Sequence, residues 1–176
     1  MKTLAILILG FATVLRTTAS EIACGAPTNA PAAISLRDQF DALQELSFPT
    51  TNVFLFTIAD KKGSEQIAGW VAPVKERFHE RVEICGIADV SAVPRMLRGL
   101  VRKKFRQAQT HSVMLDWTGE TVKEFGCVSD QVNVFVVDGE GRILKRAVGP
   151  ASEAKLRDLF SVLDQTLNSK DHVAAK

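Results

Sequence analysis

The side chains best suited to redox chemistry in this chain are its three cysteines, Cys24, Cys85 and Cys127. A thiolate is the nucleophile of thiol–disulfide exchange and a common zinc ligand, and both uses usually bring two cysteines close together in the sequence. Here no two cysteines lie within a few residues of one another. The spacing therefore predicts neither a dithiol redox pair nor a metal site, and no cofactor is expected.

The surroundings of each cysteine suggest different fates. Cys85 lies within Val82–Ala88, an apolar run that predicts a buried strand, where a reduced thiol packs as a small apolar side chain. Cys127 comes just before another apolar run and could pair with Cys24 in an oxidising compartment. An odd number of cysteines leaves at least one thiol unpaired.

Three aspartates, Asp60, Asp89 and Asp116, each close an apolar run that reads as a strand. In open α/β sheets ligands gather at the carboxyl ends of the strands, where three carboxylates could bind a divalent cation. The alternative is that each aspartate accepts hydrogen bonds from the backbone of the turn that follows it. We favour this structural interpretation, and no metal is predicted.

The segment 94–108 predicts a helix with one strongly basic face. That face carries Arg95, Arg98, Arg102, Lys103, Lys104 and Arg106, with no acidic residue among them. It could bind anionic lipid headgroups or an acidic protein, or it could simply be the solvated side of the helix. An apolar stripe of Met96, Leu97, Leu100, Val101 and Phe105 is expected to face the core.

Hydrophobic periodicity places these residues in alternating strands and helices, the pattern of an α/β domain. Pro94 suits the first turn of its helix, and Asp138-Gly139 is a hairpin turn signal. The expected elements are strands over 53–59, 82–89 and 111–116, helices over 65–80 and 94–108, a short helix ending near 125–126, a hairpin of 132–137 with 142–148, and a last helix from Ser152 to Leu167.

The ends of the chain have less regular patterns. Residues 34–37 and 43–48 alternate imperfectly and fit either one amphipathic helix or a hairpin around Asp38–Asp41. Residues 21–33, rich in Ala, Pro and Thr, predict a linker or N-terminal arm. Residues 168–176 predict a flexible tail, so the folded domain is expected over 34–167.

Residues 1–20 have the pattern of a secretory signal peptide: a short basic start, an apolar run over 4–15 and small residues at 18–20. The run is shorter than the roughly 20 apolar residues that span a bilayer. We therefore expect a periplasmic or secreted protein without a transmembrane span after cleavage. Cleavage anywhere from Ala19 to Ala23, and lipid attachment at Cys24, are open alternatives.

Loss of the signal would also change the net charge. Removal of Lys2 and Arg16 leaves 22 − 2 = 20 basic residues against 20 acidic ones. A chain without net charge is poorly suited to bulk binding of polyanions, so no nucleic-acid partner is expected. Any attraction to an anionic surface must come from a local basic patch.

Two regions of the chain resemble thioredoxin-like proteins. Asn52–Asp60 followed by residues 63–74 resembles the strand and helix that carry the Cys-x-x-Cys pair, with Ala72-Pro73 matching the Ala-Pro kink of that helix. Residues 113–119 with Phe125-Gly126, and then 135–143, look like the second half of periplasmic redoxins. The resemblance implies a thioredoxin-like fold with a central mixed β-sheet flanked by helices and an N-terminal β-hairpin.

The chain departs from this family at two positions that carry its chemistry. Alignment on Ala72-Pro73 puts Glu65 and Ala68 in the two cysteine positions. The cis-proline that holds a substrate backbone in redoxins would fall near Gln131-Val132, and no proline is present there. Such a chain resembles the cysteine-less periplasmic proteins of the YtfJ type, which implies a fold and a compartment rather than a mechanism.

Two functional hypotheses follow. The first is a non-catalytic thioredoxin-like protein that acts by binding a protein partner or an envelope surface, with a candidate cleft at Asp60, Glu65, Asp89 and Asp116. The second is a redoxin-class thiol oxidoreductase or peroxidase that uses Cys127, which then requires an exposed Cys127 thiol with a low pKa.

Overall fold

The computed structural model describes residues 27–174, with side chains described as far as Lys170. The predicted signal peptide and residues 21–26 of the predicted linker, with Cys24, lie outside the described residues. No helix in the described part of the chain is long and apolar enough to cross a membrane.

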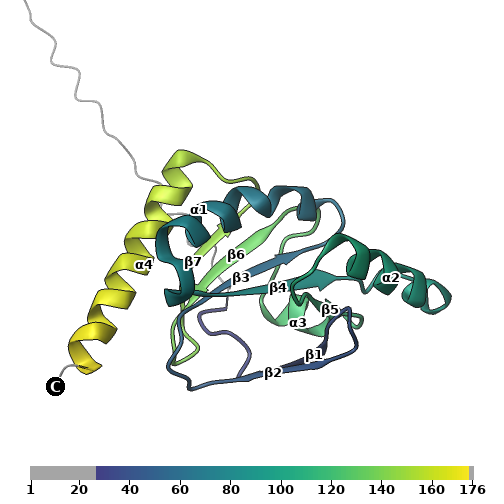
Figure 1. Cartoon of the computed structure of the whole chain (residues 1–176), viewed down its shortest axis with the longest axis horizontal. Helices are drawn as coiled ribbons and strands as arrows, with labels where there is room; N and C mark the ends of the chain where they lie inside the picture. Colours follow the sequence, from purple (N-terminus) through teal and green to yellow (C-terminus); the bar gives the residue numbers. More distant parts are fainter. Residues whose placement is uncertain (1–26, 175–176) are drawn as a thin grey trace, which may run out of the picture.

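The centre of the domain is a five-stranded mixed sheet in the order β5-β4-β3-β6-β7 (Figure 1). Strands β3 and β6 are buried along their whole length, as expected for central strands covered on both faces. Strands β3, β4 and β5 run parallel, and β6 and β7 pair antiparallel. The strands are β3 (Phe54–Ala59), β4 (Glu83–Asp89), β5 (Met114–Asp116), β6 (Asn133–Val137) and β7 (Ile143–Val148).

The helices occupy the intervals that the sequence predicts, although α1 and α2 have shorter bounds and α4 is longer. The predicted helix over 65–80 is a 3₁₀ turn followed by an α-helix that contains Pro73, and it ends at His79, whose φ is 48°. The helical elements are η1 (Gly63–Gln66), α1 (Ala68–Phe78), η2 (His79–Arg81), η3 (Arg95–Leu97), α2 (Arg98–Ala108), α3 (Glu120–Glu124) and α4 (Glu153–Ala174).

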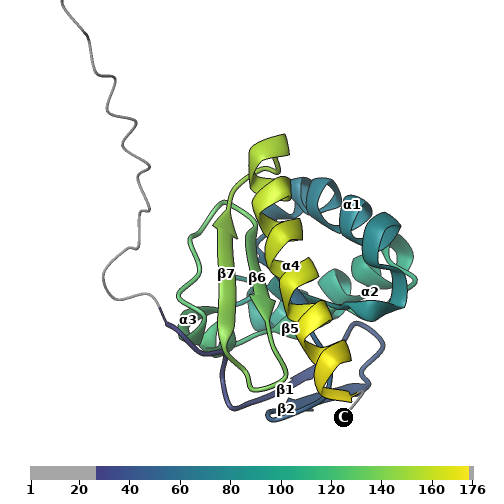
Figure 2. The ribbon, with the colours of Figure 1, turned by 90° about the vertical axis from the view of Figure 1, so that its left-hand side faces the viewer.

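Two apolar layers cover the sheet. Helices α1 and α4 lie on one face (Figure 2). There, Trp70 and Val74 of α1 pack with Leu159 and Leu163 of α4. Trp70 is fully buried, and its indole Nε1 donates a hydrogen bond of 3.0 Å to the carbonyl of Gly149. The other face is covered by the N-terminal hairpin and by α3, whose apolar side chains form a second cluster around the phenylalanines of β3 and β6. The fold class is α/β, as the sequence pattern predicts.

The N-terminal segment forms a hairpin, which settles the choice between a helix and two strands. Strands β1 (Ala33–Arg37) and β2 (Leu43–Ser47) pair antiparallel. Buried Asp38 closes the turn between them, because its carboxylate accepts hydrogen bonds from the backbone of Phe40 and Ala42 and from Ser112 beside β5. These bonds attach the hairpin to the edge of the sheet.

Both ends of the domain extend beyond the predicted bounds of 34–167. The amide of Ala30 donates to Gly141, and the amide of Ile143 donates to Thr28, so part of the predicted linker pairs with the start of β7. At the other end α4 continues to Ala174, past the predicted end at Leu167. Its start at Ser152 agrees with the capping prediction, and residues 168–174 contain no glycine or proline that would end a helix.

Candidate functional site

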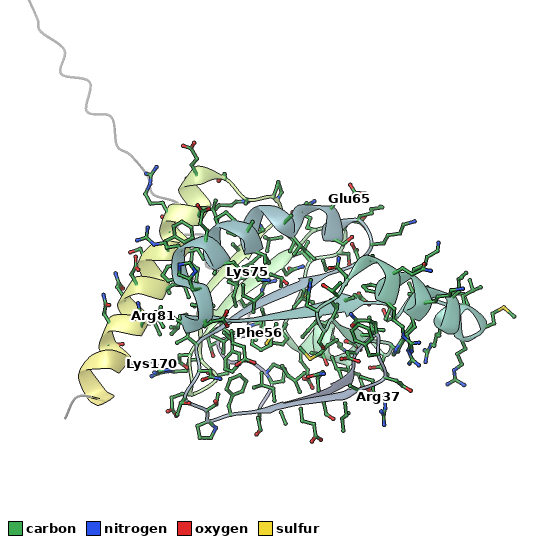
Figure 3. All side chains as sticks on the ribbon, in the orientation of Figure 1. Arg37, Phe56, Glu65, Lys75, Arg81 and Lys170 are labelled. Carbon is green, nitrogen blue, oxygen red and sulfur yellow. The ribbon has the colours of Figure 1, made fainter. Side chains whose placement is uncertain are left out.

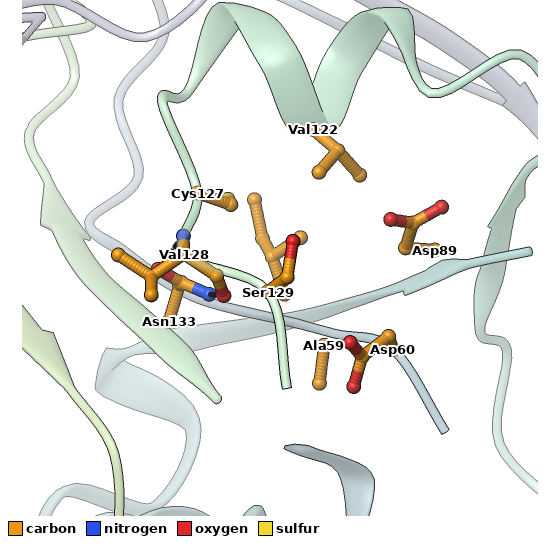
Figure 4. A pocket seen from close by; sticks show the side chains of 9 residues that line it. Ala59, Asp60, Asp89, Val122, Cys127, Val128, Ser129 and Asn133 are labelled. Carbon is orange, nitrogen blue, oxygen red and sulfur yellow. Dashed lines mark hydrogen bonds between the residues drawn. The ribbon is translucent and has the colours of Figure 1, made fainter. Parts of the chain in front are cut away.

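The carboxyl ends of β3, β4 and β5 meet at one edge of the sheet, where α/β domains usually bind ligands. A small cavity lies at this edge (Figure 4). Its volume of about 10 Å³ is close to the minimum that holds one water molecule, so the cavity has no room for a substrate. It is lined by Ile58, Ala59, Asp60, Asp89, Val122, Cys127, Val128, Ser129 and Asn133.

Two of the three strand-end aspartates use their carboxylates in their own loops. Asp116 is fully buried and accepts hydrogen bonds from the amides of Gly119, at 2.7 Å, and Val122, at 3.1 Å. Asp89 accepts from the amide and the hydroxyl of Ser91, at 3.0 and 2.7 Å. These are the capping bonds of our structural interpretation, and within residues 27–170 no group of three His, Cys, Asp or Glu side chains is placed to hold a metal ion.

Asp60 has a wider role because it joins two segments. Its Oδ1 accepts the amide of Gly63 at 2.8 Å, and its Oδ2 accepts the amide of Asp130 at 2.6 Å. Burial opposes ionisation of this carboxyl group, but the backbone hydrogen bonds and the nearby Lys62 together lower its pKa. Asp60 therefore fastens the start of η1 to the loop that precedes β6.

The same junction is closed by direct backbone packing. A Cβ atom on Gly63 would lie 2.4 Å from the backbone C and O atoms of Gln131 and 2.8 Å from the amide of Val132. Only glycine fits this approach. An ion pair of 2.8 Å between Lys62 and Asp130 spans the outside of the junction.

The polar groups of the loop before β6 are satisfied within the domain. The amide of Val132 donates to Gln66 Oε1 at 3.3 Å, and its carbonyl accepts the amide of Gly149. The buried side chain of Asn133 donates to the carbonyls of Val128 and Gln131 and accepts the amide of Val128. The resemblance to redoxins implies that a substrate backbone would bind at this loop, and here the loop bonds to its own fold.

The two positions that our sequence prediction aligns with the redox cysteines lie beside this junction. Glu65 lies in η1 and Ala68 begins α1, and both are exposed. Figure 3 shows Glu65 on the outer side of the turn, away from the sheet. Of the four candidate cleft residues, Asp60 and Asp89 line the small cavity, whereas Glu65 and Asp116 do not.

The two cysteines in the described part of the chain are half-buried and are not bonded to each other. Burial raises the pKa of Cys127 to about 12, and the nearby Asp89 and Asp116 add to this rise against the opposing effect of Arg146. Burial and the charge of Glu83 raise the pKa of Cys85 to about 12 as well. Pairing of Cys127 with Cys24 stays a prediction, because Cys24 lies outside the described residues.

The basic helix α2 is oriented differently from the sequence prediction. Its inner side consists of half-buried Arg98, Val101, Arg102 and Phe105, which follow one another at helical spacing. The predicted apolar stripe is therefore divided: Val101 and Phe105 turn inward, whereas Met96, Leu97 and Leu100 are exposed. No residue of α2 is fully buried.

Three arginines of the predicted binding surface contact the domain itself. Arg98 lies over the ring of Trp117, at 5.0 Å from its centroid, and donates to the Trp117 carbonyl. Arg102 pairs with Asp41 at 3.3 Å, and Arg106 donates to the Gln39 carbonyl at 2.5 Å. Arg95 and Lys103 remain exposed, together with Lys104. Arginines occupy the inner side of α2, where apolar side chains were expected, because Trp117 offers a π face and the hairpin turn offers oxygen acceptors.

Sequence reasoning missed several residues that shape this site. Asn133 could have been noticed, because it is a polar residue inside the apolar run 132–137, and a buried amide needs internal partners. Gln66, Asp130 and Gln131 have no such signal, since their roles depend on two segments that meet only in the folded domain.

Comparison with known proteins finds similar folds but no similar sequences. No family model matches the chain, and no curated protein matches its sequence closely enough to count as a relative. Several solved structures match in fold. A suggested thiol:disulfide interchange protein DsbE from Chlorobium tepidum has a TM-score of 0.61 and 17% identity, over 81% of this chain and 99% of that one.

Two further structures give the same result. The exposed lipoprotein thioredoxin Etrx1 from Streptococcus pneumoniae has a TM-score of 0.59 and 13% identity, over 76% of this chain and 99% of that one. StoA from Bacillus subtilis has a TM-score of 0.57 and 15% identity, with the same coverage. Identities this low establish the fold and not the activity. The chain thus has a thioredoxin-like fold.

Proposed function

We propose that this chain is an extracytoplasmic thioredoxin-like domain that acts by binding a protein partner or an envelope surface, without dithiol chemistry. The observation that carries the proposal is the closed junction between η1 and the loop before β6. At this junction Gly63 packs directly on the backbone of Gln131, and Asp60 bonds to both segments.

The thiols of the described residues support this proposal. Thiol–disulfide exchange requires a thiolate, and the positions aligned with the redox pair hold Glu65 and Ala68. With its pKa raised to about 12, Cys127 would be ionised in roughly one molecule in 10⁵ at pH 7. Its thiol would therefore react far more slowly than an ordinary exposed cysteine.

The backbone around the junction supports the proposal independently of the thiols. A redoxin-like mechanism needs free backbone groups to hold a substrate chain beside the reactive sulfur. Here the amide of Val132, its carbonyl and the carbonyl of Gln131 are all bonded within the domain. Adding a substrate strand would require these bonds to break first.

Two observations support the extracytoplasmic location: the signal pattern over residues 1–20 and the descriptions of proteins with a similar fold. One of the similar structures is described as an exposed lipoprotein, and another as a thiol:disulfide interchange protein.

The rival function is a thiol oxidoreductase or peroxidase that uses Cys127. Its support is that Cys127 lines the cavity at the carboxyl edge of the sheet. Half-burial and a raised pKa are the opposite of what a nucleophilic cysteine requires.

A turnover assay tests the proposal. The purified mature protein is offered hydrogen peroxide and a protein disulfide substrate, each with a thiol reductant present. Our proposal predicts rates no higher than those of buffer, for the wild type and for Cys127→Ser alike. Turnover that is lost in Cys127→Ser but kept in the matched variant Cys85→Ser would establish the rival function.

A further inference from the structure

The outer side of helix α2 and of the turn η3 before it combines apolar and basic side chains. Met96 is 88% exposed, Leu97 44% and Leu100 53%. Met96 and Leu100 are four residues apart, and Lys103 follows three residues later, so all three share one side of the helix. Exposed large apolar side chains gathered at one place mark an interaction surface. We call these three apolar residues, with Arg95, Lys103 and Lys104, the α2 tip.

The charge of the α2 tip is entirely positive. Arg95, Lys103 and Lys104 are exposed and make no ion pair with any described residue. The sequence has no acidic residue between Asp89 and Asp116. Asp41 of the hairpin turn pairs with Arg102 at the side of the helix. The α2 tip therefore presents unneutralised cations around an apolar centre.

The position of α2 favours a flat partner. The helix projects from the end of the molecule that lies away from α4 (Figure 1). Its inner side is fixed to the domain by Arg98 and Arg102, which leaves the apolar side chains pointing outward. A projecting apolar and basic surface is the arrangement of helices that lie in the interface of a bilayer, with lysine and arginine at the headgroups and apolar side chains below them.

We propose that the α2 tip docks this domain on an anionic lipid bilayer. Met96, Leu97 and Leu100 enter the boundary between headgroups and acyl chains, and Arg95, Lys103 and Lys104 contact the lipid phosphates. The neighbouring Lys103 and Lys104 favour lipid over a protein partner, because lysine is depleted in protein–protein interfaces and clustered lysines attract anionic lipid. This inference rests on the proposed function, and it specifies the envelope surface as the partner.

The test is sedimentation of the full mature protein with vesicles of 30% phosphatidylglycerol in phosphatidylcholine, and with vesicles of phosphatidylcholine alone. We expect binding to the anionic vesicles that weakens as salt is raised. Each lysine near such a surface strengthens binding roughly fivefold, so Lys103→Gln/Lys104→Gln should bind roughly 25-fold more weakly. Met96→Ser/Leu100→Ser should bind at least roughly tenfold more weakly, because the inserted apolar area is lost.

A matched control removes the same number of lysine charges at positions outside the α2 tip. Lys61 and Lys123 are also exposed, and Lys61→Gln/Lys123→Gln should bind within about twofold of the wild type if the α2 tip carries the interaction. All variants replace exposed side chains, and thermal unfolding verifies that each is folded.

Several outcomes would overturn this inference. They are no binding of the wild type to anionic vesicles, equal binding to both vesicle types, and equal weakening by the control and by the α2 variants. Loss of a self-associated form in Met96→Ser/Leu100→Ser, without vesicle binding, would assign the α2 tip to a second copy of the chain. If the protein does not bind the anionic vesicles and also lacks thiol turnover, the proposed binding function is kept, with a partner other than lipid.

Discussion

Replacing Gly63 with alanine should loosen the junction between η1 and the loop before β6. The new Cβ atom would lie 2.4 Å from the backbone of Gln131, whereas ordinary van der Waals contact begins at 3.4 Å. The two segments must therefore move apart by about 1 Å. Backbone atoms cannot rotate away as a side chain could, so the strain falls on the whole junction.

The cost follows from the contacts that the movement disturbs. Overpacking in a closed interior costs roughly 1–3 kcal/mol. The hydrogen bonds from the amides of Gly63 and Asp130 to Asp60 also lengthen, and bonds to a charged group contribute roughly 1.5–3 kcal/mol each. Alanine recovers roughly 0.4–1 kcal/mol by restricting the unfolded chain. We therefore expect Gly63→Ala to lower the free energy of unfolding by about 3 kcal/mol.

Urea unfolding at pH 7 measures this change, with Gly99→Ala as the matched control. Gly99 lies in α2 with no atom within 4 Å of its Cβ position, so alanine there should raise stability by up to about 1 kcal/mol through helix propensity. In a domain of this size the Gly63 variant should melt roughly 6–12 °C lower. If Gly63→Ala unfolds within about 0.5 kcal/mol of the wild type, the closed junction is not as described.

Three further predictions concern the charges and thiols of the domain. The pKa of Asp60 is lowered in the folded state. The stabilisation that ionised Asp60 gives the folded domain is therefore complete above the unfolded pKa of about 3.9, and it is lost as pH falls through the folded pKa. Asp60→Asn should thus be less stable than the wild type at pH 7, and a stability gap that does not shrink below about pH 4 would contradict this. Arg98→Lys keeps the charge but loses the planar stacking on Trp117, so urea unfolding should show a loss of about 1 kcal/mol. Exposed Arg95→Lys is the control and should change stability by less than about 0.5 kcal/mol. Since burial raises the pKa of Cys85 and Cys127 to about 12, the unfolded chain ionises first above about pH 8.5, and stability should fall by about 1.4 kcal/mol per pH unit for each thiol. Cys85→Ala/Cys127→Ala should remove that fall in stability between pH 8 and pH 10. If the free energy of unfolding of this variant falls with pH as steeply as that of the wild type, burial does not suppress ionisation of the two thiols.

The sequence predicts the central sheet well because local patterns determine those elements. The apolar runs that become β3 and β6 are buried on both faces, and Gly126, expected to end α3, has the positive φ of 62° that favours glycine. Asp89 and Asp116 cap their own loops, and the sequence can predict such short-range hydrogen bonds.

The remaining features depend on contacts between distant segments. An amphipathic pattern predicts that arginines face solvent, but Arg98 and Arg102 turn inward because Trp117 and Asp41 lie there in the folded domain. The pairing of Thr28 and Ala30 with the start of β7 is equally invisible in a segment rich in Ala and Pro. The contact of Gly63 with Gln131 joins segments far apart in the chain, and no local rule indicates it.

The central claim is that this thioredoxin-like domain holds no reactive thiol at its carboxyl edge. The most direct measurement is the pH dependence of alkylation of Cys127 in the Cys24→Ser/Cys85→Ser variant, folded and in urea. Our account predicts a labelling midpoint in the folded protein well above that of the unfolded chain, which should lie near the ordinary value of about 8.5. A folded-state midpoint well below that value would make Cys127 a nucleophile and would contradict the account.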